Sequence, residues 1–167
     1  MRTHYLTLFQ ATLGRFFTTT LVLAFSIALL TGCASIPDIQ EPPSVVSYAL
    51  SLQGAPYRYG KASPEEGFDC SGFVQYVYAE QGVRLPRTVS EMVAALPPVS
   101  KNDLQAGDLV FFNTVRNKAS HVGLYIQDNK FIHSPSSRAG KVQISSLDNQ
   151  YWSQRFSGVR RPTAKDE

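Results

Sequence analysis

The segment GFDCSGFVQYVY, residues 67–78, places a cysteine at the start of a predicted helix. Its apolar side chains recur at helical spacing, which predicts a helix over residues 70–81 with one face in a core. A cysteine with a packing role is expected within such an apolar face, because free cysteine is among the most buried residue types. Cys70 instead lies at the junction between loop and helix. Its position makes it a candidate for chemistry.

The remaining sequence predicts helices first and strands afterwards. Ser44 is placed to cap a helix over residues 44–53, and TVSE at 88–91 has capping-box spacing for a helix that ends near Ala95. Five short β-favouring runs follow: DLVFF (108–112), HVGLYI (121–126), KFIHS (130–134), KVQIS (141–145) and RFSGVRRP (155–162), the last as an edge strand. Residues 54–68 are expected to form a loop. Because helices and strands do not alternate, the pattern predicts an α+β domain, with N-terminal helices packed on an antiparallel β-sheet.

The first 33 residues have the features of an export signal. The basic, acid-free start is followed by LVLAFSIALL (21–30), which is short for a membrane span and typical of a signal peptide. The run ends in LTGC (30–33), which resembles the lipobox of bacterial lipoproteins. We therefore expect a signal peptide over 1–32, a lipidated Cys33 with a tether over 33–43, a domain over 44–162 and a polar tail over 163–167.

The expected location follows from the residue after the lipidated cysteine. Lipid on Cys33 would anchor the protein to a membrane, and a residue other than Asp after it, here Ala34, favours sorting to the outer membrane of a diderm envelope. We therefore expect a cell-envelope lipoprotein on the periplasmic face of the outer membrane. No adaptor or protease partner can be named from these residues.

Composition and charge exclude other classes. The 167 residues are 43% hydrophobic and 17% charged, as in a globular protein. The formal charge of +3 includes two arginines of the leader, so the remaining chain is close to neutral. Such a balance gives no support to nucleic-acid binding. Neither a phosphate-binding glycine loop nor tight metal-ligand spacing is present, so we expect no cofactor and no metal.

Cys70 and two histidines make a set that suits nucleophilic catalysis. With Cys33 lipidated, Cys70 has no disulfide partner within the chain. His121 and His133 lie on neighbouring predicted strands joined by the turn QDNK (127–130), so the two side chains can meet on one face of the sheet. A helix N-terminus lowers a thiol pKa, one imidazole takes the thiol proton, and a second polar group orients it. The Cys70 amide is a candidate oxyanion donor.

Several motifs together resemble those of the NlpC-type peptidoglycan endopeptidases, a family of papain-like cysteine hydrolases. The matching stretches are GAPYRYG, GFDCSGFVQYVY, LPRTVSEM, LQAGDLVFF, HVGLYI, FIHS and YWSQRFSGVRRP, in the family's order and spacing. The resemblance implies the family's α+β fold, with Cys70 as nucleophile, His121 as base and His133 as the orienting residue.

The resemblance also implies a substrate. Members of the family cleave peptidoglycan stem or cross-link peptides at a bond between a D-amino acid and a diamino acid. Tyr57 would line the site, and Asp69 and Ser71 would contact polar groups of the peptide. Two departures, Tyr59-Gly60-Lys61 and Ser134-Pro135, leave the cleaved bond open. The alternatives are a non-catalytic lipoprotein that binds peptidoglycan or recruits enzymes, and an amidase or acyltransferase with the same triad.

Overall fold

The structure, a computed structural model, describes residues 44–115 and 119–163. The predicted signal peptide, Cys33, its tether and residues 164–167 of the tail lie outside these ranges. In chain order the elements are α2 (Val45–Ser51), β1 (Ala62–Ser63), β2 (Gly67–Phe68), α3 (Cys70–Ala79), α4 (Val89–Ala95), β3 (Pro98–Val99), a 3-10 turn (Lys101–Asp103), β4 (Leu109–Phe112), β5 (His121–Gln127), β6 (Lys130–His133), β7 (Gln143–Ser146), α5 (Gln150–Ser153) and β8 (Phe156–Arg160). In the described ranges no helix is long and apolar enough to cross a membrane.

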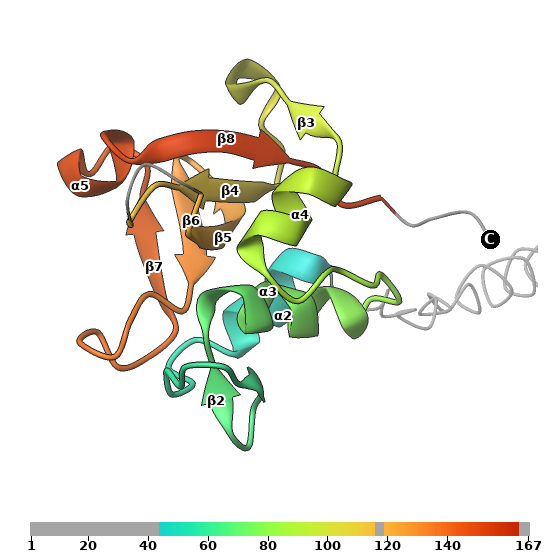
Figure 1. Cartoon of the computed structure of the whole chain (residues 1–167), viewed down its shortest axis with the longest axis vertical. Coiled ribbons are helices and arrows are strands. Elements are labelled where there is room, and N and C mark those ends of the chain that lie inside the picture. The colour runs from blue at the N-terminus through green and yellow to red at the C-terminus, as the bar shows by residue number, and fades with distance from the viewer. Residues whose placement is uncertain (1–43, 116–118, 164–167) are drawn as a thin grey trace, which may run out of the picture. The chain divides into compact units, whose positions relative to one another are not determined.

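Six strands form one antiparallel sheet in the order β3-β8-β4-β5-β6-β7, which confirms the predicted α+β class (Figure 1). The predicted edge position of β8 is wrong. Val159 of β8 pairs with Val110 of β4 on one side and with Val99 of β3 on the other. The two-residue β3 forms the edge instead, and it begins at Pro98, which has no N–H to donate to a further strand.

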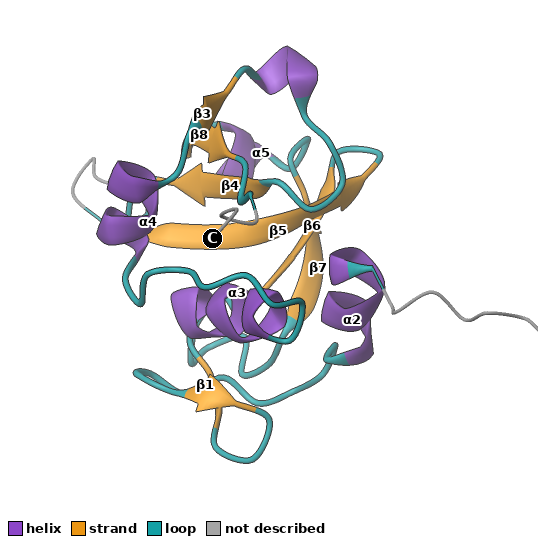
Figure 2. Cartoon of the chain, turned by 90° about the vertical axis from the view of Figure 1, so that its right-hand side faces the viewer, coloured by secondary structure: helices purple, strands orange, loops and turns teal. Residues whose placement is uncertain are grey.

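Both faces of the sheet are covered. Helices α2 and α3 lie along one face, beside β5, as Figure 2 shows. There the α3 side chains Phe73, Val74 and Val77 share one core cluster with side chains from β4, β5 and β6: Leu109, Phe111, Val122, Leu124 and Ile132. The other face holds a second cluster around Val110, Phe112, Phe131, Leu147 and Val159, bordered by Trp152 and Phe156. All four residues of β4 are therefore buried, which explains why LVFF is apolar without alternation.

Helices α3 and α4 begin at the predicted residues. Asp69 caps α3 by accepting from the N–H of Gly72, and Thr88 forms a complete capping box with Glu91 at the start of α4. Helix α3 ends at Ala79, two residues before the predicted end. The chain then turns, with the Val83 N–H donating to the Tyr78 carbonyl and Gly82 at φ +76°.

The β5–β6 hairpin sets the position of both histidines. Its turn residues Asp128 and Asn129 have φ of 50° and 55°, as a two-residue hairpin turn with two left-handed positions requires. Leu124 pairs with Ile132, and the register places His121 and His133 on the face of the sheet away from α3. The predicted turn and the shared face are confirmed.

The predicted loop over residues 54–68 is held by backbone hydrogen bonds to the segment between β6 and β7. It contains the two-residue strands β1 and β2, which were not predicted. The Tyr57 N–H donates to the Gly140 carbonyl over 2.8 Å, and Gly54 and Val142 are also joined by a backbone hydrogen bond. The segment before the cysteine helix is thereby held against the connection between β6 and β7.

Candidate active site

Cys70 is the first residue of α3, and the loop before it packs tightly on the helix start. The Asp69 N–H donates to the Lys61 carbonyl over 3.0 Å. A Cβ on Gly72 would lie 2.2 Å from that same carbonyl oxygen, so only glycine allows this approach. The loop and the first turn of α3 thus form one fixed wall that carries the half-buried Cys70 thiol.

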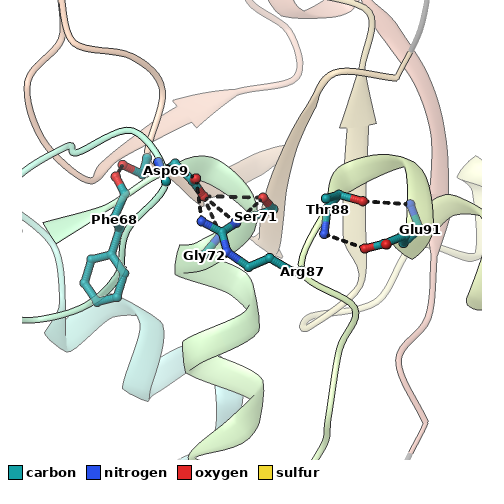
Figure 3. Close-up of polar contacts among 9 residues, drawn as sticks. Phe68, Asp69, Ser71, Gly72, Arg87, Thr88 and Glu91 are labelled. Carbon is teal, nitrogen blue, oxygen red and sulfur yellow. Dashed lines mark hydrogen bonds and ion pairs between the residues drawn. The ribbon is translucent and has the colours of Figure 1, made fainter. Parts of the chain in front are cut away.

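Asp69 is the centre of the polar network on this wall (Figure 3). Its Oδ1 accepts from the N–H of Gly72 at 2.7 Å, from Arg87 at 3.0 Å and from the Ser71 hydroxyl at 3.3 Å. Its Oδ2 accepts from the N–H of Gly60 at 2.9 Å and from Arg87 at 2.7 Å. Five donors therefore hold this carboxylate, which caps α3 and fixes Gly60 as well as Arg87.

Arg87 completes this network and was not singled out from the sequence. Its guanidinium binds Asp69 through two nitrogens and donates to the Ser71 hydroxyl at 2.9 Å. The guanidinium and the N–H donors hold the pKa of Asp69 below its usual value, although burial acts in the opposite direction. The wall consequently carries a fixed carboxylate and a fixed guanidinium beside the thiol. Eighteen residues separate the partners, so no local pattern indicates the pair.

The histidines form a hydrogen-bonded pair on the opposite wall. His121 Nε2 lies 2.7 Å from His133 Nδ1, and both side chains are buried. His133 is linked in turn to a hydroxyl that the sequence did not indicate, because its Nε2 lies 2.9 Å from Ser145 Oγ on β7. The strand pairing predicted this proximity of the two imidazoles, and the structure confirms it.

Aromatic rings enclose the histidine pair. Trp152 stacks on His121 with ring centroids 5.3 Å apart and meets His133 edge-on at 4.8 Å. The ring centroid of Phe112 lies 6.2 Å from that of His121, and the ring centroid of Phe131 lies 4.7 Å from that of His133. Trp152 was not among the residues predicted for the site, and its helix α5 was not predicted. The imidazoles therefore lie in apolar surroundings, in contrast to the polar wall around Asp69.

Burial shifts the pKa values of the thiol and the imidazoles in opposite directions. It raises the pKa of the Cys70 thiol, with a further rise from the Asp69 carboxylate, and the N–H groups of Val122, Ser71 and Cys70 only partly oppose this. The N–H groups at the helix start lower the thiol pKa as expected, but burial and the Asp69 carboxylate outweigh them, so the net shift of the pKa is upward. Burial lowers the pKa of His121 to about 4 and that of His133 well below 6.5. The thiol and the imidazoles are thus all uncharged at neutral pH.

A cleft of about 520 Å³ lies between the two walls. It is lined by Tyr57, Tyr59, Asp69, Cys70, Ser71 and Arg87 on one side and by Thr114, Ser120, His121 and Pro135 on the other. Cys70 and His121 thus face the same space. Tyr57 is half-buried in this cleft, whereas Tyr59 is 88% exposed at its rim.

The arrangement can support acyl transfer. His121 Nε2 faces His133, so its Nδ1 is the nitrogen available to the thiol. The N–H of Cys70 is among the first of α3, and these donors lack carbonyl partners within the helix. Within the described ranges, no group of three or more His, Cys, Asp or Glu side chains is placed to hold a metal ion.

Comparison with known proteins assigns the chain to a family. Residues 54–161 match the NlpC/P60 family. The chain belongs to the NlpC/P60 family. It is 44% identical over 129 residues to the Murein DD-endopeptidase MepH of Escherichia coli K12. The aligned region covers 74% of this chain and 47% of that protein. It is 42% identical over 111 residues to the Bifunctional muramidase/DL-endopeptidase CwlT of Bacillus subtilis 168, covering 65% of this chain and 33% of that protein.

A solved structure shows the same fold. The crystal structure of an NlpC/P60 family protein from Bacillus cereus ATCC 10987 superposes with a TM-score of 0.66 at 34% identity, covering 72% of this chain and 39% of that one. The chain therefore spans about half or less of the length of these relatives.

Proposed function

We propose that this NlpC/P60 protein is a cell-wall hydrolase, a cysteine endopeptidase that cleaves peptidoglycan stem or cross-link peptides at a D-amino acid–diamino acid bond. The observation that carries the proposal is the cleft with Cys70 on one wall and the 2.7 Å His121–His133 pair on the other. The names of the two relatives above, a DD-endopeptidase and a DL-endopeptidase, support peptidoglycan as the substrate.

The reaction begins from the uncharged pair. His121 Nδ1 takes the proton of the Cys70 thiol as the sulfur attacks the peptide carbonyl, and the new imidazolium is stabilised by His133. The N–H of Cys70 donates to the oxygen that becomes negative. The C–N bond then breaks, and His121 returns the proton to the leaving amine. The acyl-enzyme is hydrolysed when His121 removes a proton from water, which releases the acid and restores the thiol.

The polar wall is suited to hold the peptide near the sulfur. Asp69, Ser71 and Arg87 supply charge and hydrogen-bonding groups beside Cys70, and Tyr57 adds an aromatic side chain. We infer that Tyr57, Asp69 and Ser71 contact the substrate's polar groups in this cleft. The Asp69 carboxylate also has a structural task, because its five donors hold the wall together.

The test is cleavage of purified peptidoglycan by the protein, with the released fragments identified by mass spectrometry. New fragments from the parent protein and none from Cys70→Ala are the expected result, and the fragment masses identify the bond. A folded parent protein that releases nothing would contradict the proposal and favour the non-catalytic alternative. Products with a cleaved sugar–peptide amide, or with a transferred acyl group, would favour an amidase or acyltransferase.

We propose in addition that the protein is a lipoprotein, anchored by lipid on Cys33 to the periplasmic face of the outer membrane. The LTGC sequence and Ala34 support this proposal. Labelled palmitate should be incorporated into the parent protein and not into Cys33→Ser, and the label should fractionate with the outer membrane. Equal labelling of both proteins would contradict lipidation at this residue.

A further inference from the structure

Ser145 forms the end of a hydrogen-bonded series that begins in the cleft. His121 Nε2 lies 2.7 Å from His133 Nδ1, and His133 Nε2 lies 2.9 Å from Ser145 Oγ. His133 is fully buried, with 0% of its surface exposed, so its ring nitrogens depend on these two protein partners. Ser145 is half-buried on β7, the strand at one edge of the sheet.

The reaction needs one particular arrangement of protons along this series. His121 must present an unprotonated Nδ1 to Cys70, so in its neutral form the proton lies on Nε2. That N–H donates to His133 Nδ1, which must therefore be unprotonated. Neutral His133 then carries its proton on Nε2 and needs an acceptor there. Ser145 Oγ is the atom in that place.

The strand geometry fixes this acceptor. Ser145 pairs with Phe131, and the two neighbouring pairs are Ile132 with Ile144 and His133 with Gln143. Side chains alternate along a strand, so residue 145 shares the face of Phe131 and His133, whereas Ser146 points to the other face. The Ser146 hydroxyl binds Asp148 instead. A hydroxyl at residue 145, and not at residue 146, can reach the histidine.

We propose that Ser145 is a positioning residue whose oxygen accepts the Nε2–H of His133, and that it thereby holds both histidines in the tautomers that leave His121 Nδ1 open to the Cys70 proton. The choice of tautomers and the kinetic consequence rest on the proposed endopeptidase function, whereas the tautomers themselves can be measured without any turnover. Ser145 acts through His133 and His121 and touches no reacting atom.

The experiment compares Ser145→Ala with two matched variants of the full chain. Ser145→Thr keeps the hydroxyl and suits a strand, and Ser146→Ala removes a hydroxyl from the adjacent position on the opposite face. Nitrogen-15 chemical shifts of the imidazoles report which nitrogen carries the proton. Initial rates on peptidoglycan peptides give kcat and KM for each protein.

In the parent protein, both histidines should carry the proton on Nε2. Ser145→Ala should move the His133 shifts toward a mixture of tautomers and lower kcat about 10- to 100-fold, the range expected when a buried group loses its partner, with KM changed less than about twofold. Ser145→Thr and Ser146→Ala should keep the parent shifts and stay within about threefold of its kcat.

Two results would overturn the proposal. One is a parent His133 protonated on Nδ1, or unchanged shifts in Ser145→Ala. The other is a Ser145→Ala variant with altered shifts and unaltered kcat, which would remove the positioning role. If the parent protein cleaves no peptide at all, the endopeptidase proposal fails, and the nitrogen shifts still decide whether Ser145 sets the tautomers.

Discussion

The two walls of the cleft hold their reactive groups by different means. The cysteine wall is polar, with Asp69 bound to Arg87 and to two backbone N–H groups. The histidine wall is apolar, with Trp152 stacked on His121. Burial raises the pKa of the thiol and lowers that of the imidazole, because in each case it disfavours the charged form. Two chemically different walls therefore give the same result, an uncharged pair ready for proton transfer.

The largest effect is expected when a substitution removes the base, His121, from the apolar wall. His121→Ala should lower turnover of peptidoglycan peptides by about 10³-fold, within the range for loss of a general acid–base group. Circular dichroism should show the fold retained, and Cys70→Ala provides the background rate. A His121→Ala protein that keeps its turnover would show that the histidine wall does not supply the base.

The second prediction concerns pH and the same wall. The pKa of His121 is about 4 in the folded protein and about 6.5 when unfolded, so the unfolded state binds more protons between these values. The free energy of unfolding should therefore be at its full value above pH 6.5 and fall by about 3 kcal/mol as pH approaches 4. Urea denaturation across this range measures the loss, and His121→Gln should remove part of it.

Activity should report the same pKa. The acid limb of kcat/KM should lie near pH 4 in the parent protein, since His121 must be neutral to accept the thiol proton. Trp152→Ala exposes the apolar wall to solvent and should move the acid limb of kcat/KM toward pH 6.5. A parent limb already at 6.5 would mean that the burial of His121 does not control its protonation.

A smaller effect is expected from the polar wall. Arg87→Met removes the charged partner of a largely buried carboxylate and should lower the free energy of unfolding by about 1–2 kcal/mol, since the guanidinium itself is partly exposed. Arg84→Met, at an exposed arginine three residues earlier, is the control and should be within about 0.5 kcal/mol of the parent. Equal stabilities of the two variants would show that the pair does not hold this wall together.

The smallest change in stability is expected for a substitution at the edge of the cysteine wall. Thr88 caps α4 and lines the cleft next to Arg87. Thr88→Ala should cost about 1 kcal/mol of stability, the usual value for a lost cap, and Thr88→Ser should restore most of it. Thermal unfolding of the two variants measures the difference.

Local patterns predicted the parts of the site that depend on local structure. The helix from Cys70, the capping box at Thr88 and the hairpin turn that brings His121 to His133 each follow from residues close in sequence. Arg87, Ser145 and Trp152 were missed because their partners lie on other elements, and alternation along a strand gives a face without naming the neighbour. The inner position of β8 was missed for the same reason, because its pairing with β4 and β3 is long-range.

The burial of Cys70 has a consequence for redox chemistry. Peroxides and disulfides react with the thiolate, and a raised pKa leaves little thiolate at neutral pH. A resting Cys70 should therefore resist oxidation in a compartment where exposed thiols are lost, which is where the proposed lipoprotein would work. The sulfur becomes nucleophilic only when His121 takes its proton during attack on a bound peptide.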